Sequence, residues 1–222
     1  MSKVGERRQR LPLRWPFEEA VAGFRSSALA TEGYDPAATF VWGQMMAVGV
    51  LELVKAVERS FGAEGQAIAV EALRSVGRRV GREMFEGAEI PAGLSQAQLV
   101  SLFASWINEV AYASVEEAWA EEDRVGFDIV YCPHQAEYGA FDCRIQRYLV
   151  EGMLEAARDL LGARGFDIRV EATIPAGAPA CRFVIWQTED ERPCGWEARS
   201  QALGRMALEG KPGSPGAREE LR

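Results

Sequence analysis

Residues 124–131, Arg-Val-Gly-Phe-Asp-Ile-Val-Tyr, decide the fold. Apolar side chains occupy every second position from Val125 to Tyr131, which is the period of a strand with one buried face. Pro133 ends this strand. Residues 166–172 repeat the alternation, and residues 181–187 form another apolar run after a short turn rich in proline and glycine. The C-terminal half is therefore expected to contain a small antiparallel sheet whose last two strands form a hairpin.

The residues before this strand have helical periodicity instead. Through the first 120 residues, apolar side chains recur every three or four positions, and Asp35-Pro36 and Ser95 are typical of helix starts. One stripe is expected to face the core and to end at Gly62; its members are Met46, Val50, Leu53, Val57 and Phe61. The acidic residues at positions 116–123 are expected to be a solvated helix end.

Four glycines lie inside the predicted helices, namely Gly43, Gly49, Gly77 and Gly81. Each costs about 1 kcal/mol relative to alanine in a helix interior. Close helix packing, or a ligand lying against bare backbone, is the expected compensation.

These patterns predict an α+β protein, with a helical N-terminal half packed on a small C-terminal α+β domain that has an antiparallel sheet. We expect four parts along the chain. They are a flexible basic arm (1–16), a helical region (17–123), an α+β domain with the candidate site (124–190), and a C-terminal helix with a disordered tail (191–222).

Composition restricts the classes of partner. The chain has 222 residues, of which 48% are apolar, and a formal charge of −8, which argues against nucleic acid and anionic membranes. No apolar run is expected to reach the 18 residues of a membrane span, and no secretion signal is recognised, so a cytoplasmic protein is expected. We expect a small-molecule substrate and no cofactor, and leave homo-oligomer formation open.

The chemistry-bearing residues gather around the one histidine of the chain, His134. Cys132, His134, Glu137, Asp142 and Cys143 lie within twelve positions, where the predicted strand opens into a loop and the next helix begins. Loops at strand ends commonly hold functional groups. A site that depends on several histidines is excluded.

Either of two cysteines could act as a nucleophile. If Asp142 caps the next helix, Cys143 is its first residue, where the helix dipole and free N–H groups stabilise a thiolate. Cys132 lies beside the imidazole, and the choice between the two stays open. Each cysteine could also be a small apolar side chain of the core.

A zinc site is a further alternative. Cys132, His134, Cys143 and Cys181 form a Cys₃His set. A single residue separates Cys132 from His134, whereas structural zinc sites usually place two to four residues between paired ligands. We therefore expect no metal.

The C-terminal half resembles a known family over residues 98–188. The matching residues are Phe127 to Pro133, Cys143, Arg169, Thr173 to Gly177, and Cys181 to Phe183. This pattern is similar to that of the L-2-amino-thiazoline-4-carboxylic acid hydrolase family. The resemblance implies a helical region followed by an α+β domain of the vinyl-reductase ligand-binding type. It also implies ring opening of a small thiazoline, and it points to Cys132, Cys143 and Cys181.

We therefore predict a hydrolase that opens a small heterocyclic or cyclic amidine-like bond. Cys143 or Cys132 attacks the ring carbon and His134 moves the protons. Arg169 is expected to hold a substrate carboxylate, or else to pair with Glu171 or Asp167. The other predicted substrate-binding residues are Cys181, Asp142 and Glu137. A small-molecule-binding or sensor domain without catalysis is the alternative.

Overall fold

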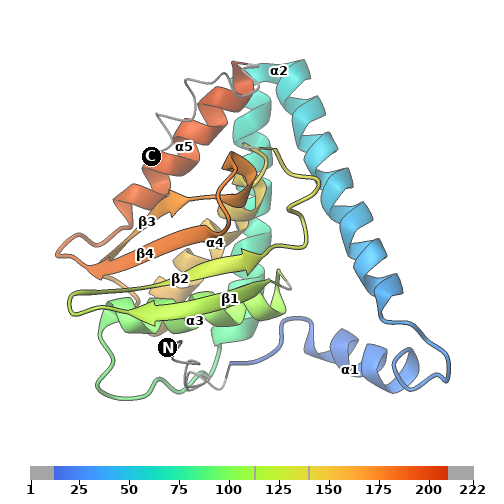
Figure 1. Cartoon of the computed structure of the whole chain (residues 1–222), viewed down its shortest axis with the longest axis horizontal. Coiled ribbons are helices and arrows are strands. Elements are labelled where there is room, and N and C mark those ends of the chain that lie inside the picture. The colour runs from blue at the N-terminus through green and yellow to red at the C-terminus, as the bar shows by residue number, and fades with distance from the viewer. Residues whose placement is uncertain (1–12, 113, 140, 210–222) are drawn as a thin grey trace. The chain divides into compact units, whose positions relative to one another are not determined.

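The computed structural model describes residues 13–112, 114–139 and 141–209. Its helices are α1 (Glu18–Ser27), α2 (Ala37–Phe85), α3 (Gln96–Val110), α4 (Arg144–Leu161) and α5 (Cys194–Leu208). The strands are β1 (Val115–Ala120), β2 (Arg124–Tyr131), β3 (Phe166–Ala172) and β4 (Cys181–Gln187), and a single 3-10 turn, η1, covers Ile174–Ala176 (Figure 1). The predicted α+β class is confirmed.

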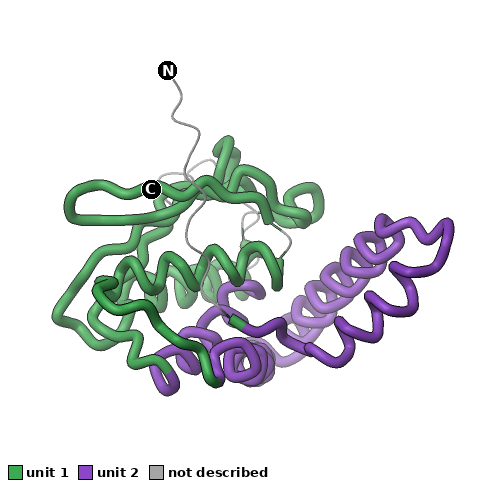
Figure 2. Tube along the Cα trace, turned by 90° about the horizontal axis from the view of Figure 1, so that it is seen from below, with its two compact units in different colours: residues 1–13, 87–144, 161–222 green, residues 14–86, 145–160 purple. Residues whose placement is uncertain are grey.

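The chain divides into two compact units (Figure 2). The first consists of residues 1–13, 87–144 and 161–222, and it holds the whole sheet with α3 and α5. The second consists of residues 14–86 and 145–160, and it holds α1, α2 and most of α4. The region expected to be helical, 17–123, is thus shared between the two units.

The sheet has the order β1-β2-β4-β3, and every neighbouring pair is antiparallel. The predicted β3–β4 hairpin is confirmed. Phe127 lies opposite Phe183, and their rings stack with centroids 4.7 Å apart. Phe183 also lies 6.2 Å from the ring of Trp196 on α5. We call the face that carries these rings the inner face and the opposite one the outer face.

Strand β1 lies where a helix was expected, so that prediction is wrong. Glutamate and alanine in residues 115–120 favour a helix locally, but pairing with β2 overrides this preference. Gly126 of β2 leaves room for the Trp119 ring, because a Cβ at that position would lie 2.4 Å from it. The helix before it, α3, ends at Val110 and begins with the predicted Ser95 cap, which is a full capping box with Gln98.

Helix α2 bends at Gly62, whose φ of 59° and ψ of −138° are not helical. This confirms the predicted interruption there. We call residues 37–61 the first arm and residues 63–85 the second arm. The prediction that the first-arm stripe faces the core is wrong, because Met46, Leu53 and Phe61 are 45%, 64% and 68% exposed.

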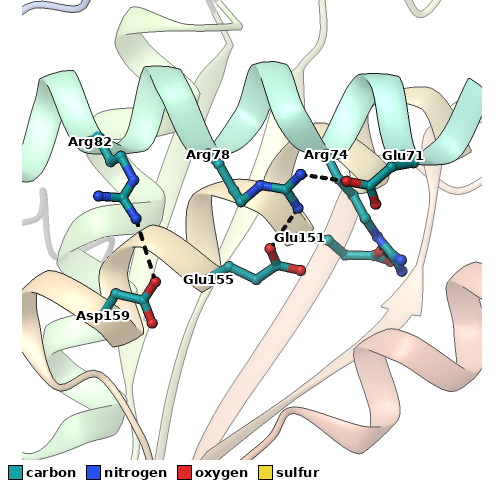
Figure 3. A network of polar contacts seen from close by, with 7 residues as sticks. All are labelled: Glu71, Arg74, Arg78, Arg82, Glu151, Glu155 and Asp159. Carbon is teal, nitrogen blue, oxygen red and sulfur yellow. Dashed lines mark hydrogen bonds and ion pairs between the residues drawn. The ribbon is translucent and has the colours of Figure 1, made fainter.

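The second arm packs tightly on α4 within the second unit. A Cβ at Gly77 would lie 2.0 Å from the carbonyl oxygen of Leu149, and one at Gly152 would lie 2.1 Å from that of Arg74. Arginines of the second arm pair with acidic residues of α4: Arg74 with Glu151, Arg78 with Glu155 and Arg82 with Asp159 (Figure 3). Close packing is thus confirmed for Gly77 and Gly81, whereas no described atom lies within 4 Å of a Cβ at Gly43 or Gly49.

Two expectations concern the N-terminal part. Most of the predicted flexible arm (1–16) lies outside the described residues; within the described part of it, the Arg14 N–H donates to the carbonyl oxygen of Met84 at 3.2 Å. Helix α2 contains an 18-residue window that is long and apolar enough to cross a membrane, so the expectation that no such run exists is wrong.

Candidate active site at one end of the sheet

The register of the sheet brings two of the cysteines to the same end. Ile129 of β2 lies opposite Cys181, the first residue of β4. Cys132 follows the end of β2, and β2 and β4 run in opposite directions, so both cysteines belong to this end. The alternation that places Cys181 on the face of Phe183 and Ile185 is confirmed. Cys132, Cys143 and Cys181 are all half-buried.

Tyr138 connects the members of the cluster. Its pKa is raised to about 12, mainly by burial and further by the negative charges of ionised Cys132, Asp142 and Cys143. The His134 ring stacks on Tyr138, with centroids 5.0 Å apart and planes 20° apart. The predicted cysteines, the histidine and Asp142 therefore share one electrostatic environment.

The loop after β2 is held by its own backbone. The Tyr138 N–H donates to the His134 carbonyl oxygen at 2.9 Å, and the Gln135 N–H donates to that of Cys132 at 3.0 Å. The Gln135 side chain accepts from the Cys132 N–H at 3.2 Å. These bonds fold the loop back on itself and set the imidazole against the Tyr138 ring.

Burial keeps Cys132, Cys181 and His134 neutral at neutral pH. It raises the pKa of Cys132, an effect that a hydrogen bond from the His134 backbone partly offsets. It raises the pKa of Cys181 to about 11, although the Ile174 N–H donates to the sulfur at 3.1 Å. Burial also lowers the pKa of His134. At neutral pH both thiols are protonated and the imidazole is a free base.

Cys143 has a different environment. Helix α4 begins at Arg144, so Cys143 immediately precedes its first residue. The half-buried Arg199 of α5 interacts electrostatically with Cys143. Burial lowers the pKa of Arg199, and the interaction with Cys143 partly offsets this effect. By reciprocity, the guanidinium favours a thiolate at Cys143.

Asp142 has another role than the predicted helix cap. Its carboxylate accepts from the Gly139 N–H at 2.8 Å and lies 3.4 Å from the buried Arg144 guanidinium, which also donates to the Phe141 carbonyl oxygen at 3.0 Å. Asp142 therefore braces the loop that presents Cys143.

Two other predicted residues do not join the cluster. Arg169 lies opposite Val184, on the outer face, where it donates to Glu171 at 2.6 Å and lies 5.7 Å from the Trp186 ring centroid. The predicted substrate-carboxylate role of Arg169 is thus unsupported, and the ion pair with Glu171 is the alternative that is found. Glu137 is exposed, and its backbone N–H donates to the His134 carbonyl oxygen at 3.0 Å.

The sequence reasoning missed Tyr138 and Arg199. Tyr138 lies four residues after His134 in the same loop, so its nearness could have been inferred from the short turn. Arg199 comes from a distant helix, and no spacing in the sequence relates it to Cys143.

Among the residues that the structure describes, no group of three or more histidine, cysteine, aspartate or glutamate side chains is arranged to hold a metal ion. Cys194, at the start of α5, is exposed. The zinc alternative therefore finds no support in the geometry.

A cavity of about 410 Å³ lies on the outer face of the sheet. Trp119, Arg124, Asp128, Glu171 and Arg182 contribute to its lining, and neither His134 nor any of the cysteines does. Two of its charges are paired with each other, since Arg182 donates to both carboxylate oxygens of Asp128, at 2.9 and 2.7 Å. This cavity is separate from the cysteine cluster.

Comparison with known proteins shows one clear relationship. An uncharacterized protein of Archaeoglobus fulgidus is 46% identical over 203 residues, which cover 89% of this chain and 90% of the archaeal protein. The chain therefore belongs to the same family as that archaeal protein. No family model matches the chain, and no solved structure matches it significantly.

Proposed function

We propose that the protein is a hydrolase that opens a small heterocycle, of the thiazoline or cyclic amidine kind, with Cys143 as its nucleophile. The observation that carries the proposal is the convergence of three half-buried cysteines and the one histidine at a single end of the sheet. We choose Cys143 over Cys132 because Cys143 interacts electrostatically with the Arg199 guanidinium, whereas burial raises the pKa of Cys132.

His134 is suited to proton transfer. Because burial lowers its pKa, the imidazole is neutral at pH 7 and can accept a proton. In the proposed reaction it takes the proton of the Cys143 thiol. The thiolate attacks the electrophilic ring carbon and forms a carbon–sulfur bond. The bond from that carbon to a ring heteroatom breaks, and the heteroatom leaves with the proton from the imidazolium.

Water completes the cycle. His134 takes a proton from a water molecule that attacks the carbon of the covalent adduct. The bond to Cys143 breaks, and the sulfur regains its proton from the imidazolium, so one water molecule is consumed. Tyr138 stacks on His134 and holds the ring in place.

The substrate class rests on the resemblance to the L-2-amino-thiazoline-4-carboxylic acid hydrolase family. The residues that carry it include Cys132, Cys143 and Cys181, which are the members of the cluster. A small polar substrate in the cytoplasm agrees with the formal charge of −8, because an acidic chain is a poor partner for nucleic acid.

Turnover of thiazoline-type substrates by single cysteine variants tests the proposal. We expect Cys143→Ala to lose measurable turnover, and Cys194→Ala, whose sulfur is exposed and outside the cluster, to keep that of the wild type. Full activity of both Cys143→Ala and Cys132→Ala would exclude covalent catalysis.

A ligand-binding or sensor module is a second candidate. It is favoured by the raised pKa values of Cys132 and Cys181, which suit thiols that line a pocket without reacting. In that case every cysteine would be alkylated slowly near neutral pH, and a ligand would raise the melting temperature without being consumed.

A further inference from the structure

Arg144, the first residue of α4, is almost completely buried, with 1% of its surface exposed. A guanidinium stays charged in a folded protein, and taking a charge out of water carries a large desolvation penalty. Exchange of a buried ion pair for apolar side chains is often neutral or even stabilising. Stability alone therefore does not explain an arginine at this position, directly after the proposed nucleophile.

The side chain of Arg144 turns back to residues that precede Cys143. Its Nη1 donates to the Phe141 carbonyl oxygen at 3.0 Å and lies 3.4 Å from the Asp142 carboxylate. The Arg144 backbone N–H donates to the same carbonyl oxygen at 3.2 Å. These bonds close the turn in which Cys143 lies.

Asp142 completes the turn from the other side of Cys143. It is 9% exposed, and its second carboxylate oxygen accepts from the Gly139 N–H at 2.8 Å. The Asp142 N–H donates to the Gly139 carbonyl oxygen at 3.0 Å. Asp142 comes directly before Cys143 and Arg144 directly after it, so a buried ion pair spans the half-buried cysteine.

This ion pair brings one charge of each sign next to Cys143. Consecutive Cα atoms are about 3.8 Å apart, so both charged side chains start beside that of the cysteine. The two charges oppose each other at the sulfur, and loss of one leaves the other uncompensated in a buried environment, where Coulomb interactions are strong. A positive charge favours a thiolate and a negative charge disfavours it.

Other ionisable groups act on Cys143 from separate elements. Tyr138 of the loop and Cys181 of β4 both interact electrostatically with it, but their pKa values are raised to about 12 and about 11, so both are neutral near pH 7. Arg199 of α5 is charged. Near neutral pH, the buried ion pair therefore acts on the sulfur together with the Arg199 guanidinium.

We propose that Arg144 is a positioning residue of the candidate active site, which fixes the turn before α4 and, with Asp142, favours the thiolate of Cys143. The inference rests on the proposed role of Cys143 as the nucleophile. Arg144 has no contact with the substrate in this account, because its side chain is buried. Arg144→Met should therefore lower kcat for a thiazoline substrate and change KM by less than about twofold.

Alkylation of the full chain by iodoacetamide, with the modified cysteine located by peptide mapping, measures the Cys143 thiolate without a substrate. Arg144→Met is expected to slow alkylation of Cys143 at pH 7 by about tenfold, because the Asp142 charge is left uncompensated. Asp142→Asn keeps an oxygen for the Gly139 N–H but removes the negative charge, and is expected to speed alkylation by at least about threefold. The midpoint of the rate–pH profile should rise in the first variant and fall in the second, whereas a merely structural role would change both in the same direction.

Two further variants serve as controls. Arg144→Lys keeps the positive charge, so its alkylation rate should stay within about threefold of the wild type. Arg182→Met removes the arginine of another arginine–aspartate pair of the same unit, on the outer face, and should change alkylation of Cys143 by less than about twofold. Circular dichroism checks that each variant is folded, and if Arg144→Met is not, Asp142→Asn and Arg144→Lys decide the outcome.

Equal alkylation rates in the wild type, Arg144→Met and Asp142→Asn would overturn the proposal, and so would a change in the same direction in both variants. Neither result touches the proposed hydrolase if Cys143→Ala still abolishes turnover. Conversely, opposite changes in alkylation in a protein that turns over no thiazoline would reject the hydrolase and retain the effect of Arg144 on Cys143.

Discussion

The two faces of the sheet use their polar groups differently. On the outer face, Arg182 pairs with Asp128 and Arg169 pairs with Glu171, so the charges there already have partners. At the end of the sheet that holds the cysteine cluster, which we call the inner end, burial keeps Cys132, Cys181 and His134 neutral. Exposed ion pairs contribute little to stability, about 0–1 kcal/mol. The neutral imidazole of His134 can accept a proton, and the proposed reaction uses this property.

The largest effect should appear when one substitution in the cysteine cluster is compared with one on the outer face. Removal of the proposed nucleophile by Cys143→Ala is expected to reduce turnover by at least about a thousand-fold. Arg169→Ala, on the outer face, should change turnover by less than about twofold, because its guanidinium is occupied by Glu171. Steady-state kinetics on a thiazoline substrate measures both. An equal loss of turnover in the two variants would contradict the assignment of the chemistry to the cysteine cluster.

The next effect concerns stability at the junction of β1, β2 and β4. A Cβ at Gly126 would lie 2.1 Å from the Phe183 carbonyl oxygen, so Gly126→Ala is expected to destabilise the fold by about 3 kcal/mol. Gly43→Ala is the control, because no described atom lies within 4 Å of its added Cβ. Urea unfolding compares the two variants, and an unchanged midpoint for Gly126→Ala would show that the strands separate more easily than the geometry implies.

Alkaline pH should weaken the inner end. The pKa of Cys181 is raised from 9.0 to about 11, so the unfolded chain loses this proton first as the pH rises. Stability is therefore full below pH 9 and falls between pH 9 and 11, by about 1–2 kcal/mol after allowance for solvent screening. Unfolding of wild type and Cys181→Ala at pH 8 and at pH 10.5 tests this. If the stability of the wild type and of Cys181→Ala depended on pH in the same way, groups other than Cys181 would cause the loss of stability.

The smallest effect belongs to the outer face. Arg182 holds the pKa of Asp128 below its ordinary value, mainly through their hydrogen bonds. Arg182→Met should cost about 0.5 kcal/mol near neutral pH, because the guanidinium is half exposed. The difference from the wild type should shrink as the pH falls below 3.8 and Asp128 takes up a proton. NMR titration of the Asp128 carboxyl group should show its pKa rising in the variant.

Periodicity predicted the fold where local pattern and tertiary packing agree. The strands around Phe127 and Ile168, the β3–β4 hairpin and the Ser95 cap were all predictable, because each has its own residue pattern. Strand β1 was not, since its glutamates and alanines favour a helix and only pairing with β2 makes it a strand. The stripe of the first arm was misplaced because an apolar pattern does not say whether its side chains are buried or exposed.

The candidate site was predictable only in its local part. Cys132, His134 and Cys143 are close in sequence, and the strand register adds Cys181. Arg199 could not be found because it comes from a distant helix. Arg169 lies on the outer face, away from the cysteines, and alternation along β3 does not show which face holds a site. The rise in the pKa of Cys132 and Cys181 depends on burial, which the sequence leaves undetermined.

The position of a covalent adduct tests the proposed chemistry most directly. The wild type would be mixed with a thiazoline substrate, quenched in acid within the first turnovers, digested and mapped by mass spectrometry. An added mass confined to the peptide that contains Cys143, and absent from the Cys143→Ala variant, is the predicted result. Turnover without an adduct on Cys143, or with one on Cys132 or Cys194 instead, would contradict the assignment of the nucleophile.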